Sequence, residues 1–64
     1  MFKEDRLLTR EEAAARLSLR PQTLAAWSSQ SRGPRYMKLG KSVRYRQSDL
    51  DAFMEESYVS PERH

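Results

Sequence analysis

The chain has no cysteine, and its single histidine, His64, is its last residue. The absence of cysteine excludes disulfides and thiolate zinc sites, so we expect no metal and no cofactor. No apolar run approaches the roughly 20 residues that span a bilayer, and no signal-peptide pattern opens the chain. We therefore expect a cytoplasmic protein that does not bind membranes.

The residues also argue against an enzyme. Catalysis needs a nucleophile or a base positioned in a pocket. The chain offers no cysteine and no internal histidine, and its carboxylates lie mainly where helices are expected to start. We expect one small non-catalytic domain, with no small-molecule substrate.

Acidic residues are missing from the middle of the chain. The stretch from Arg20 to Arg46 holds seven basic residues and no acid, residues 1–19 cancel in charge, and residues 47–64 carry a net charge of −4. A concentrated basic segment favours a polyanionic partner, because each neutralised phosphate releases condensed counterions. A solvated basic surface is the alternative, but this segment coincides with a predicted helix and hairpin rather than a tail. RNA is less favoured than DNA, since no aromatic-rich sheet motif is present.

Two short helices are predicted in the first half of the chain. Thr9 and Glu12 form the pattern of a capping box, which predicts a helix over residues 10–17. Pro21 suits the first turn of a second helix, because its missing N–H costs nothing there. That helix should run to about residue 30. Two short helices with a tight joint are typical of a helix-turn-helix.

A third helix is expected to begin at Ser48 as its N-cap. Asp49 and Asp51 would lie in its first turn, where the helix dipole favours acidic side chains. Apolar residues at helical spacing in the three helices should face one common core. This expected core consists of Ala13, Ala14, Leu17, Leu24, Trp27, Leu50, Phe53 and Met54, with Tyr58 as an extension of the same stripe.

A β-hairpin is predicted between the second and third helices, with two strands flanking residues 40–42. A three-residue loop pairs Leu39 with Val43 and places Lys38 and Arg44 together on the other face. A two-residue turn mixes polar and apolar side chains on both faces. We therefore prefer the three-residue loop, which gives one apolar face and one basic face. A basic hairpin beside a helix-turn-helix is a wing.

Five short segments follow one another in a characteristic order: LTREEAA at 8–14, TLAAW at 23–27, GP at 33–34, KLGKSVRYR at 38–46 and SDLDAF at 48–53. In their order and spacing they resemble the excisionase-type, MerR-like winged helix-turn-helix family of phages and mobile elements, which includes AlpA-like regulators. The resemblance covers about residues 7–56.

The resemblance and the predicted elements together indicate an α+β, mostly helical fold. Its order is helix, helix, β-hairpin, helix, in a small winged helix-turn-helix. We expect the DNA-binding domain over residues 8–56, a flexible lead-in over residues 1–7 and a C-terminal tail over residues 57–64.

The resemblance implies that double-stranded DNA is the partner, with the second helix in the major groove and the wing on the backbone or the adjacent minor groove. Carried onto this chain, it places Gln22, Thr23 and Ala26 at base edges. Arg20, a poor N-cap, adds a charge at the groove edge. The expected backbone and wing contacts come from the resemblance and from the basic stretch: Arg32, Arg35, Lys38, Lys41, Ser42, Arg44 and Arg46.

The second helix is short of side chains that read bases. Gln22 is the one good candidate for a bidentate contact to adenine, so direct readout by a monomer should be weak. Specificity would then come from DNA shape or from several protomers, and the acidic third helix and tail could meet the basic stretch of a neighbour.

Three roles stay open at this point. The first is an excisionase, or recombination directionality factor, that binds and bends DNA beside an attachment site to direct an integrase. The second is an AlpA-like transcriptional regulator. The third is a protein-interaction adaptor with weak affinity for DNA.

Overall fold

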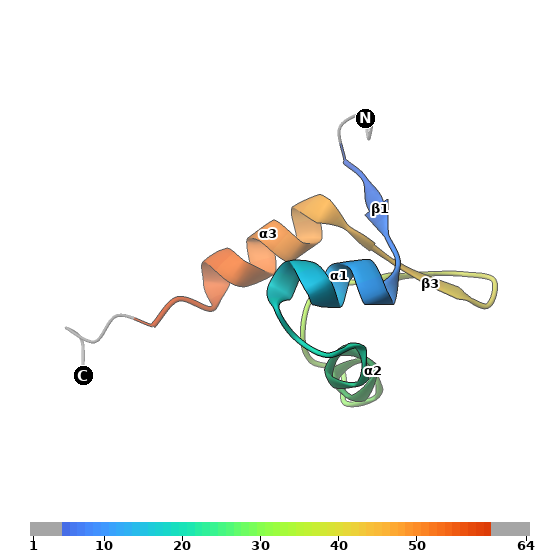
Figure 1. The fold of residues 1–64 in the computed structure, drawn as a ribbon, viewed down its shortest axis with the longest axis horizontal. Coiled ribbons are helices and arrows are strands. Elements are labelled where there is room, and N and C mark those ends of the chain that lie inside the picture. The colour runs from blue at the N-terminus through green and yellow to red at the C-terminus, as the bar shows by residue number, and fades with distance from the viewer. Residues whose placement is uncertain (1–4, 60–64) are drawn as a thin grey trace.

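The computed structural model describes residues 5–59. The elements follow in the order β1 (Leu7–Leu8), α1 (Arg10–Leu17), α2 (Pro21–Ser29), β2 (Met37–Leu39), β3 (Ser42–Arg46) and α3 (Gln47–Glu56). The strands form one antiparallel sheet in the order β1-β3-β2. The hairpin of β2 and β3 projects from one side of the helices, and the end of α3 projects from the other (Figure 1). The predicted winged helix-turn-helix fold is confirmed.

Helix α1 begins where its capping box predicts. The Thr9 hydroxyl accepts from the backbone N–H of Glu12 at 3.1 Å, and the Glu12 carboxylate accepts from the backbone N–H of Thr9 at 2.9 Å. At the other end, Ser18 adopts a left-handed conformation with φ of 57°, and its N–H closes the last turn. These contacts satisfy backbone groups that a helix end would otherwise leave unpaired.

Helix α2 also has its predicted bounds, and its C-terminus is fixed by a close contact. Pro21 occupies the first turn, and the N-cap residue Arg20 makes no capping hydrogen bond with its side chain. After the helix, Gly33 has φ of +88°, and a Cβ at this position would lie 2.7 Å from Cε3 of Trp27. Glycine is therefore required here both by its backbone conformation and by the approach of the Trp27 ring.

The core is small and draws on β1, α1, α2, β3 and α3. Its buried members are Leu8, Ala13, Ala14, Leu24, Tyr45 and Leu50, with Leu17, Trp27 and Val43 packed against them. Three predicted members, Phe53, Met54 and Tyr58, lie outside it, and Phe53 is half-buried. Met54 is 38% exposed and Tyr58 is 81% exposed, because α3 continues past the core after its first turns (Figure 1).

The register of the hairpin differs from the prediction. Leu39 pairs with Ser42 across a two-residue turn, so the predicted three-residue loop is wrong. A buried face would favour the three-residue loop, but Leu39 is 52% exposed, so the core does not select the face on which it lies. One residue beyond β2, the observed register brings Tyr36 opposite Tyr45, with the ring centroids 5.8 Å apart. Gly40, with φ of 64°, fits a type II′ turn, in which glycine takes the first position.

The segment before α1 forms a short strand that was not predicted from the sequence. Leu7 and Leu8 form β1, which pairs with the end of β3, although residues 1–7 were expected to be a flexible lead-in. Next to this strand, the carbonyl oxygen of Arg6 accepts from the backbone N–H of Gln47 at 2.9 Å. The first residues described are thereby joined to the start of α3.

The N-terminus of α3 is capped by Asp5, not by Ser48. The helix begins at Gln47, so Ser48 lies within its first turn and the predicted N-cap is wrong. Both the backbone N–H and the hydroxyl of Ser48 donate to the Asp5 carboxylate, at 3.0 and 2.7 Å. Asp49 does lie in the first turn, as predicted, but Asp51 lies beyond it because the helix begins earlier than expected.

Of the helices within residues 5–59, none has the length and apolar character needed to cross a membrane. Of the expected tail over residues 57–64, residues 60–64 lie outside the described part of the chain.

Candidate nucleic-acid interface

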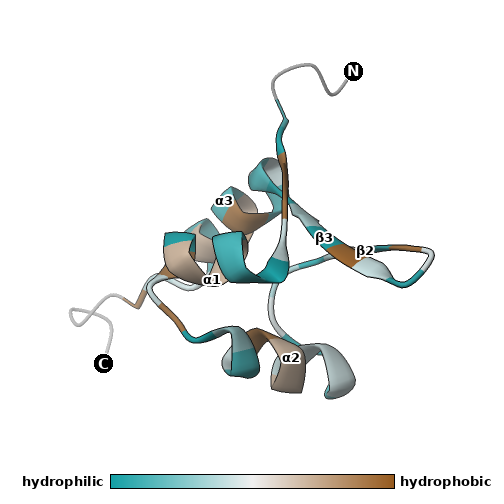
Figure 2. Cartoon of the chain, turned by 45° about the vertical axis from the view of Figure 1, so that its right-hand side comes forward, coloured by the Kyte–Doolittle hydropathy of each residue, from teal (hydrophilic) through white to brown (hydrophobic). Residues whose placement is uncertain are grey.

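The outer face of α2 is exposed opposite its buried anchor. Leu24 is 1% exposed, while Gln22 and Ala26 lie on the other side of the helix and are exposed. Thr23 is half-buried, and its backbone N–H donates to the carbonyl oxygen of Arg20 at 3.0 Å. Of the residues predicted at base edges, the structure therefore presents Gln22 and Ala26 fully and Thr23 in part. In Figure 2, α2 lies below α1 and α3, along one edge of the molecule.

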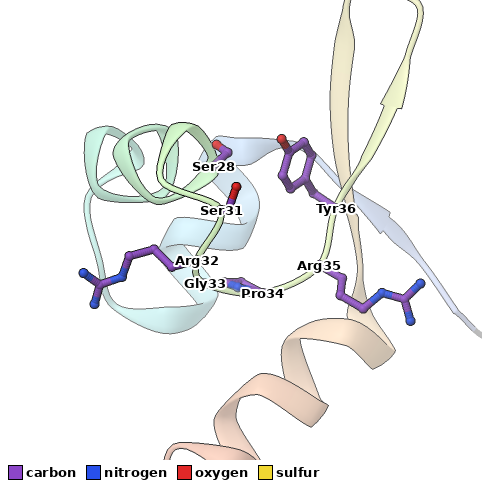
Figure 3. Close-up of a pocket in the computed structure, with 7 residues that line it drawn as sticks. All are labelled: Ser28, Ser31, Arg32, Gly33, Pro34, Arg35 and Tyr36. Carbon is purple, nitrogen blue, oxygen red and sulfur yellow. The ribbon is translucent and has the colours of Figure 1, made fainter.

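Two of the expected backbone contacts follow α2 in the loop to β2. The guanidinium of Arg32 lies over the Trp27 ring, 5.5 Å from its centroid, in cation–π geometry. On α3, the ring of Phe53 lies 5.7 Å from that of Trp27. Arg35 is exposed, and Figure 3 shows the Arg32 and Arg35 side chains extending to opposite sides of the loop.

The wing carries its charges differently from the prediction. Lys38 lies opposite Val43, and Arg44 lies opposite Met37, so Lys38 and Arg44 occupy opposite faces of the hairpin. The predicted single basic face is therefore wrong, and it fails for the same reason as the register. Lys38 is exposed, while Arg44 is half-buried and donates from Nη1 to the Val43 carbonyl oxygen at 2.8 Å.

The tip of the wing is open to solvent. Lys41 and Ser42 are both exposed, and no atom lies within 4 Å of the position that a Cβ on Gly40 would take. The hairpin thus offers cations on both of its faces and at its tip.

Two helices joined by residues 18–20, followed by a hairpin and a third helix, match a known arrangement. A family model described as a helix-turn-helix domain covers residues 7–58. The chain belongs to this helix-turn-helix family. It is the family of excisionase and AlpA-like helix-turn-helix domains, which confirms the resemblance drawn from the sequence. Neither a curated protein nor a solved structure matches the chain.

Arg46, which was predicted to contact the DNA backbone, forms an ion pair within the fold. Arg46 donates to both carboxylate oxygens of Asp49, from Nε at 2.9 Å and from Nη2 at 3.2 Å. Its Nε also lies 3.9 Å from the Asp5 carboxylate. The hydrogen bond to Asp49 is the main cause that raises the pKa of Arg46 above its ordinary value. Its charge is therefore already balanced inside the fold, and we do not count it among the phosphate contacts.

An open groove of about 350 Å³ separates the end of α2 from the start of the hairpin. Its lining residues are Ser28, Ser31, Arg32, Gly33, Pro34, Arg35 and Tyr36. In Figure 3 the Ser31 and Tyr36 side chains border this space, the Ser28 hydroxyl turns back toward α2, and the two arginines point away from the space. The groove lies between the two parts that a winged helix-turn-helix sets against DNA.

Sequence reasoning missed Arg10. Arg10 is the first residue of α1, and its Nη2 donates to the Ser28 hydroxyl at 3.3 Å, which joins α1 to α2. The Ser28 hydroxyl in turn donates to carbonyl oxygens of its own helix, at Leu24 and Ala25. No local sequence signal marks this contact, because residues 10 and 28 are brought together by helix packing.

Proposed function

We propose that this helix-turn-helix protein binds double-stranded DNA, with α2 in the major groove and the wing against the backbone or the adjacent minor groove. The observation that carries the proposal is the exposed face of α2 beside a hairpin with cations on both faces. A narrow element with Lys38 on one face and Arg44 on the other is suited to phosphates on either side of a groove. Such a role would place the protein in the cytoplasm with the DNA.

Electrostatics supplies most of the proposed affinity. The basic side chains expected to meet phosphates, apart from Arg46, are either exposed or half-buried. They are Arg20, Arg32, Arg35, Lys38, Lys41 and Arg44. If all six meet phosphates, the logarithm of the binding constant should fall with the logarithm of salt concentration with a slope of about −5.

Sequence discrimination is proposed to be weak in a single protomer. Gln22 can form a bidentate pair with adenine, and the Ala26 methyl can contact a thymine methyl. One bidentate contact gives about 1–3 kcal/mol of discrimination, which is small for a selective site. DNA shape and several protomers bound together would then supply the remaining selectivity.

For the biological role, we propose an excisionase that binds several sites beside an attachment site, bends the DNA and directs an integrase. Weak readout by one protomer supports a protein that acts in several copies. The end of α3 combines the acids Glu55 and Glu56 with exposed Met54, Tyr58 and Val59, so it could contact the basic wing of a neighbour. An AlpA-like transcriptional regulator is the alternative with the same surface chemistry, and an adaptor with weak DNA affinity is the second alternative.

The binding proposal is tested by fluorescence anisotropy with duplex DNA over a salt series. We expect tight binding at low salt and a steep linear loss on the logarithmic plot. Little affinity for duplex DNA at physiological salt would contradict the proposal and favour the adaptor.

The role is tested by a footprint on the DNA that surrounds the protein's own gene. A ladder of repeated sites beside an integrase attachment site supports excision, and one promoter site supports regulation. A variant that lacks residues 57–64 tests self-association in the same titration, because unchanged cooperativity would remove the tail from the mechanism.

A further inference from the structure

We propose that Arg10, together with the hydroxyl groups of Ser31 and Tyr36, forms a binding site for one phosphate group of the DNA backbone at the groove between α2 and the wing. The proposal rests on the proposed DNA-binding function. It adds α1 to an interface that was expected to consist of α2, the loop and the wing alone.

Arg10 carries a positive charge that is partly shielded from solvent. The residue is half-buried, and within residues 5–59 its guanidinium has no carboxylate partner. Among the described residues, its buried Nε has no hydrogen-bond acceptor, and the guanidinium makes one hydrogen bond, the 3.3 Å contact from Nη2 to the neutral Ser28 hydroxyl. A partly desolvated cation with five N–H donors and one weak neutral acceptor favours an anionic ligand.

Arg10 lies beside the groove. Ser28, which it contacts, forms one wall of the groove, and Tyr36 forms part of the other. The start of α1 also approaches the Tyr36 side, because Leu8 pairs with Tyr45 and the Tyr45 ring packs on that of Tyr36. In Figure 3 the chain entering α1 passes behind the gap between Ser28 and Tyr36. Nη2 of Arg10 thus lies 3.3 Å from the hydroxyl of a residue that lines the groove.

Two hydroxyl groups, those of Ser31 and Tyr36, can donate hydrogen bonds at the opening of the groove. Ser31 and Tyr36 are exposed, and within the described part of the chain their hydroxyl groups have no hydrogen-bond partner. Ser31 adopts a left-handed backbone conformation with φ of 57° shortly after α2, and this conformation sets the direction of its Cα–Cβ bond. A backbone phosphate diester presents two charged non-bridging oxygens, each of which can accept more than one hydrogen bond, so one guanidinium and two hydroxyl groups can share it.

The acidic residues next to Arg10 in the sequence restrict which anions the site can bind. Glu11 and Glu12 lie in the first turn of α1, and Glu12 is committed to the backbone N–H of Thr9. Their charges weaken the attraction for a free anion in solution. A phosphate delivered by DNA is held by the other contacts of the interface, so a duplex is the ligand that fits this site.

The experiment compares the parent with Arg10→Gln and, as a matched control, Arg16→Gln. Both changes remove one positive charge from α1, but Arg16 lies in the last turn, where it is 4.0 Å from Asp51 of α3. We expect Arg10→Gln to weaken duplex binding about tenfold and to reduce the salt slope by about one. Arg16→Gln should leave both unchanged. An identical salt slope for the parent and Arg10→Gln would overturn the proposal.

Phosphate ethylation locates the contact. Ethylation of one backbone position should interfere with the parent and no longer interfere with Arg10→Gln, and an interference pattern shared by both proteins would count against the site. Should Arg10→Gln fail to fold, Tyr36→Phe replaces it, because it removes the hydroxyl and keeps the ring on Tyr45. We expect Tyr36→Phe to keep the parent's melting temperature and to weaken binding several-fold, and unchanged affinity would overturn the role of Tyr36.

Failure of the proposed function gives a different result. In that case the parent itself shows no salt-dependent binding to duplex DNA. A titration with inorganic phosphate, followed by amide chemical shifts of Ser31 and Tyr36 and by the Nε–H signal of Arg10, then separates the two sources of phosphate. Saturable shifts with inorganic phosphate but no duplex binding would assign the site to a free anion and overturn its assignment to DNA.

Discussion

The Asp5 carboxylate accepts two hydrogen bonds from Ser48, one from its backbone N–H at 3.0 Å and one from its hydroxyl at 2.7 Å. Asp5 precedes β1, and Ser48 lies in the first turn of α3, so the pair joins the beginning of the described chain to the start of its last helix. Arg46 connects the same carboxylate to Asp49. The start of α3, which positions Leu50 in the core, is therefore held by a residue 43 positions earlier in the chain.

Replacing Asp5 should destabilise the domain without removing a DNA contact. Asp5→Asn keeps the size of the side chain but loses the charge at the helix N-terminus and one acceptor oxygen. We expect the melting temperature to fall by about 5 °C in a domain of this size. Asp51→Asn is the matched control, because Asp51 is exposed and its ion pair with Arg16 is long, at 4.0 Å. Equal melting temperatures for the parent and Asp5→Asn would show that the cap is not formed in solution.

The same contact makes stability depend on pH in a defined direction. Hydrogen bonds from the Ser48 backbone and hydroxyl, and to a lesser extent the charge of Arg46, hold the pKa of Asp5 below its ordinary value of 3.8. The unfolded chain therefore takes up the proton first as pH falls, and the stabilisation is present above about pH 4 and is lost as pH falls through the lowered pKa.

Thermal melts of the parent and Asp5→Asn across the acid range measure this effect. The difference between their melting temperatures should be constant from neutral pH to about pH 5 and should shrink at lower pH. The other carboxylates are present in both proteins, so the difference isolates Asp5. A gap that widens on acidification would contradict the assignment.

The elements set by local interactions were predictable from the sequence. The capping box of Thr9 and Glu12 and the proline at the start of α2 act within a few residues, and both helices have their predicted bounds. The alternation of the wing misled the prediction, because burial selects a register only where one face is covered, and Leu39 is exposed.

Contacts between distant segments could not be read from the sequence. Asp5 reaches Ser48 because β1 pairs with β3, and Arg10 reaches Ser28 because α1 packs on α2. For the candidate site, the sequence correctly put Gln22 and Ala26 on an exposed helix face. It could not show that Asp49 balances the charge of Arg46.

Gly33 and Gly40 provide a matched pair, because both have positive φ and differ in their surroundings. Gly33→Ala would place a Cβ 2.7 Å from the Trp27 ring, whereas a Cβ at Gly40 meets no atom within 4 Å. We expect Gly40→Ala to cost about 1 kcal/mol from backbone strain and Gly33→Ala to cost about 3 kcal/mol, since packing is disturbed as well. Chemical denaturation measures both values, and equal costs would show that the ring moves aside freely.

Arg44 and Arg46 are two residues apart on β3 and should respond oppositely to the same substitution. Arg44→Gln should reduce the salt slope of duplex binding by about one and leave the melting temperature unchanged. Arg46→Gln should lower the melting temperature, because it leaves Asp49 and Asp5 without their cation, and should keep the salt slope. Anisotropy titrations and thermal melts on both variants check this. A loss of salt slope in Arg46→Gln would return Arg46 to the interface.

Gln22→Ala tests whether α2 reads bases. Because a bidentate pair between glutamine and adenine contributes about 1–3 kcal/mol of discrimination, the variant should bind its preferred site and non-specific DNA with more nearly equal affinity. Non-specific affinity and the salt slope should stay the same, since no charge is removed. Gln30→Ala is the control, because it removes the same amide from the exposed end of α2. Competition between the preferred site and variants with single adenine replacements gives the measurement. If Gln22→Ala keeps the parent's preference at every position, the protein selects its sites through DNA shape and neighbouring protomers rather than through this side chain.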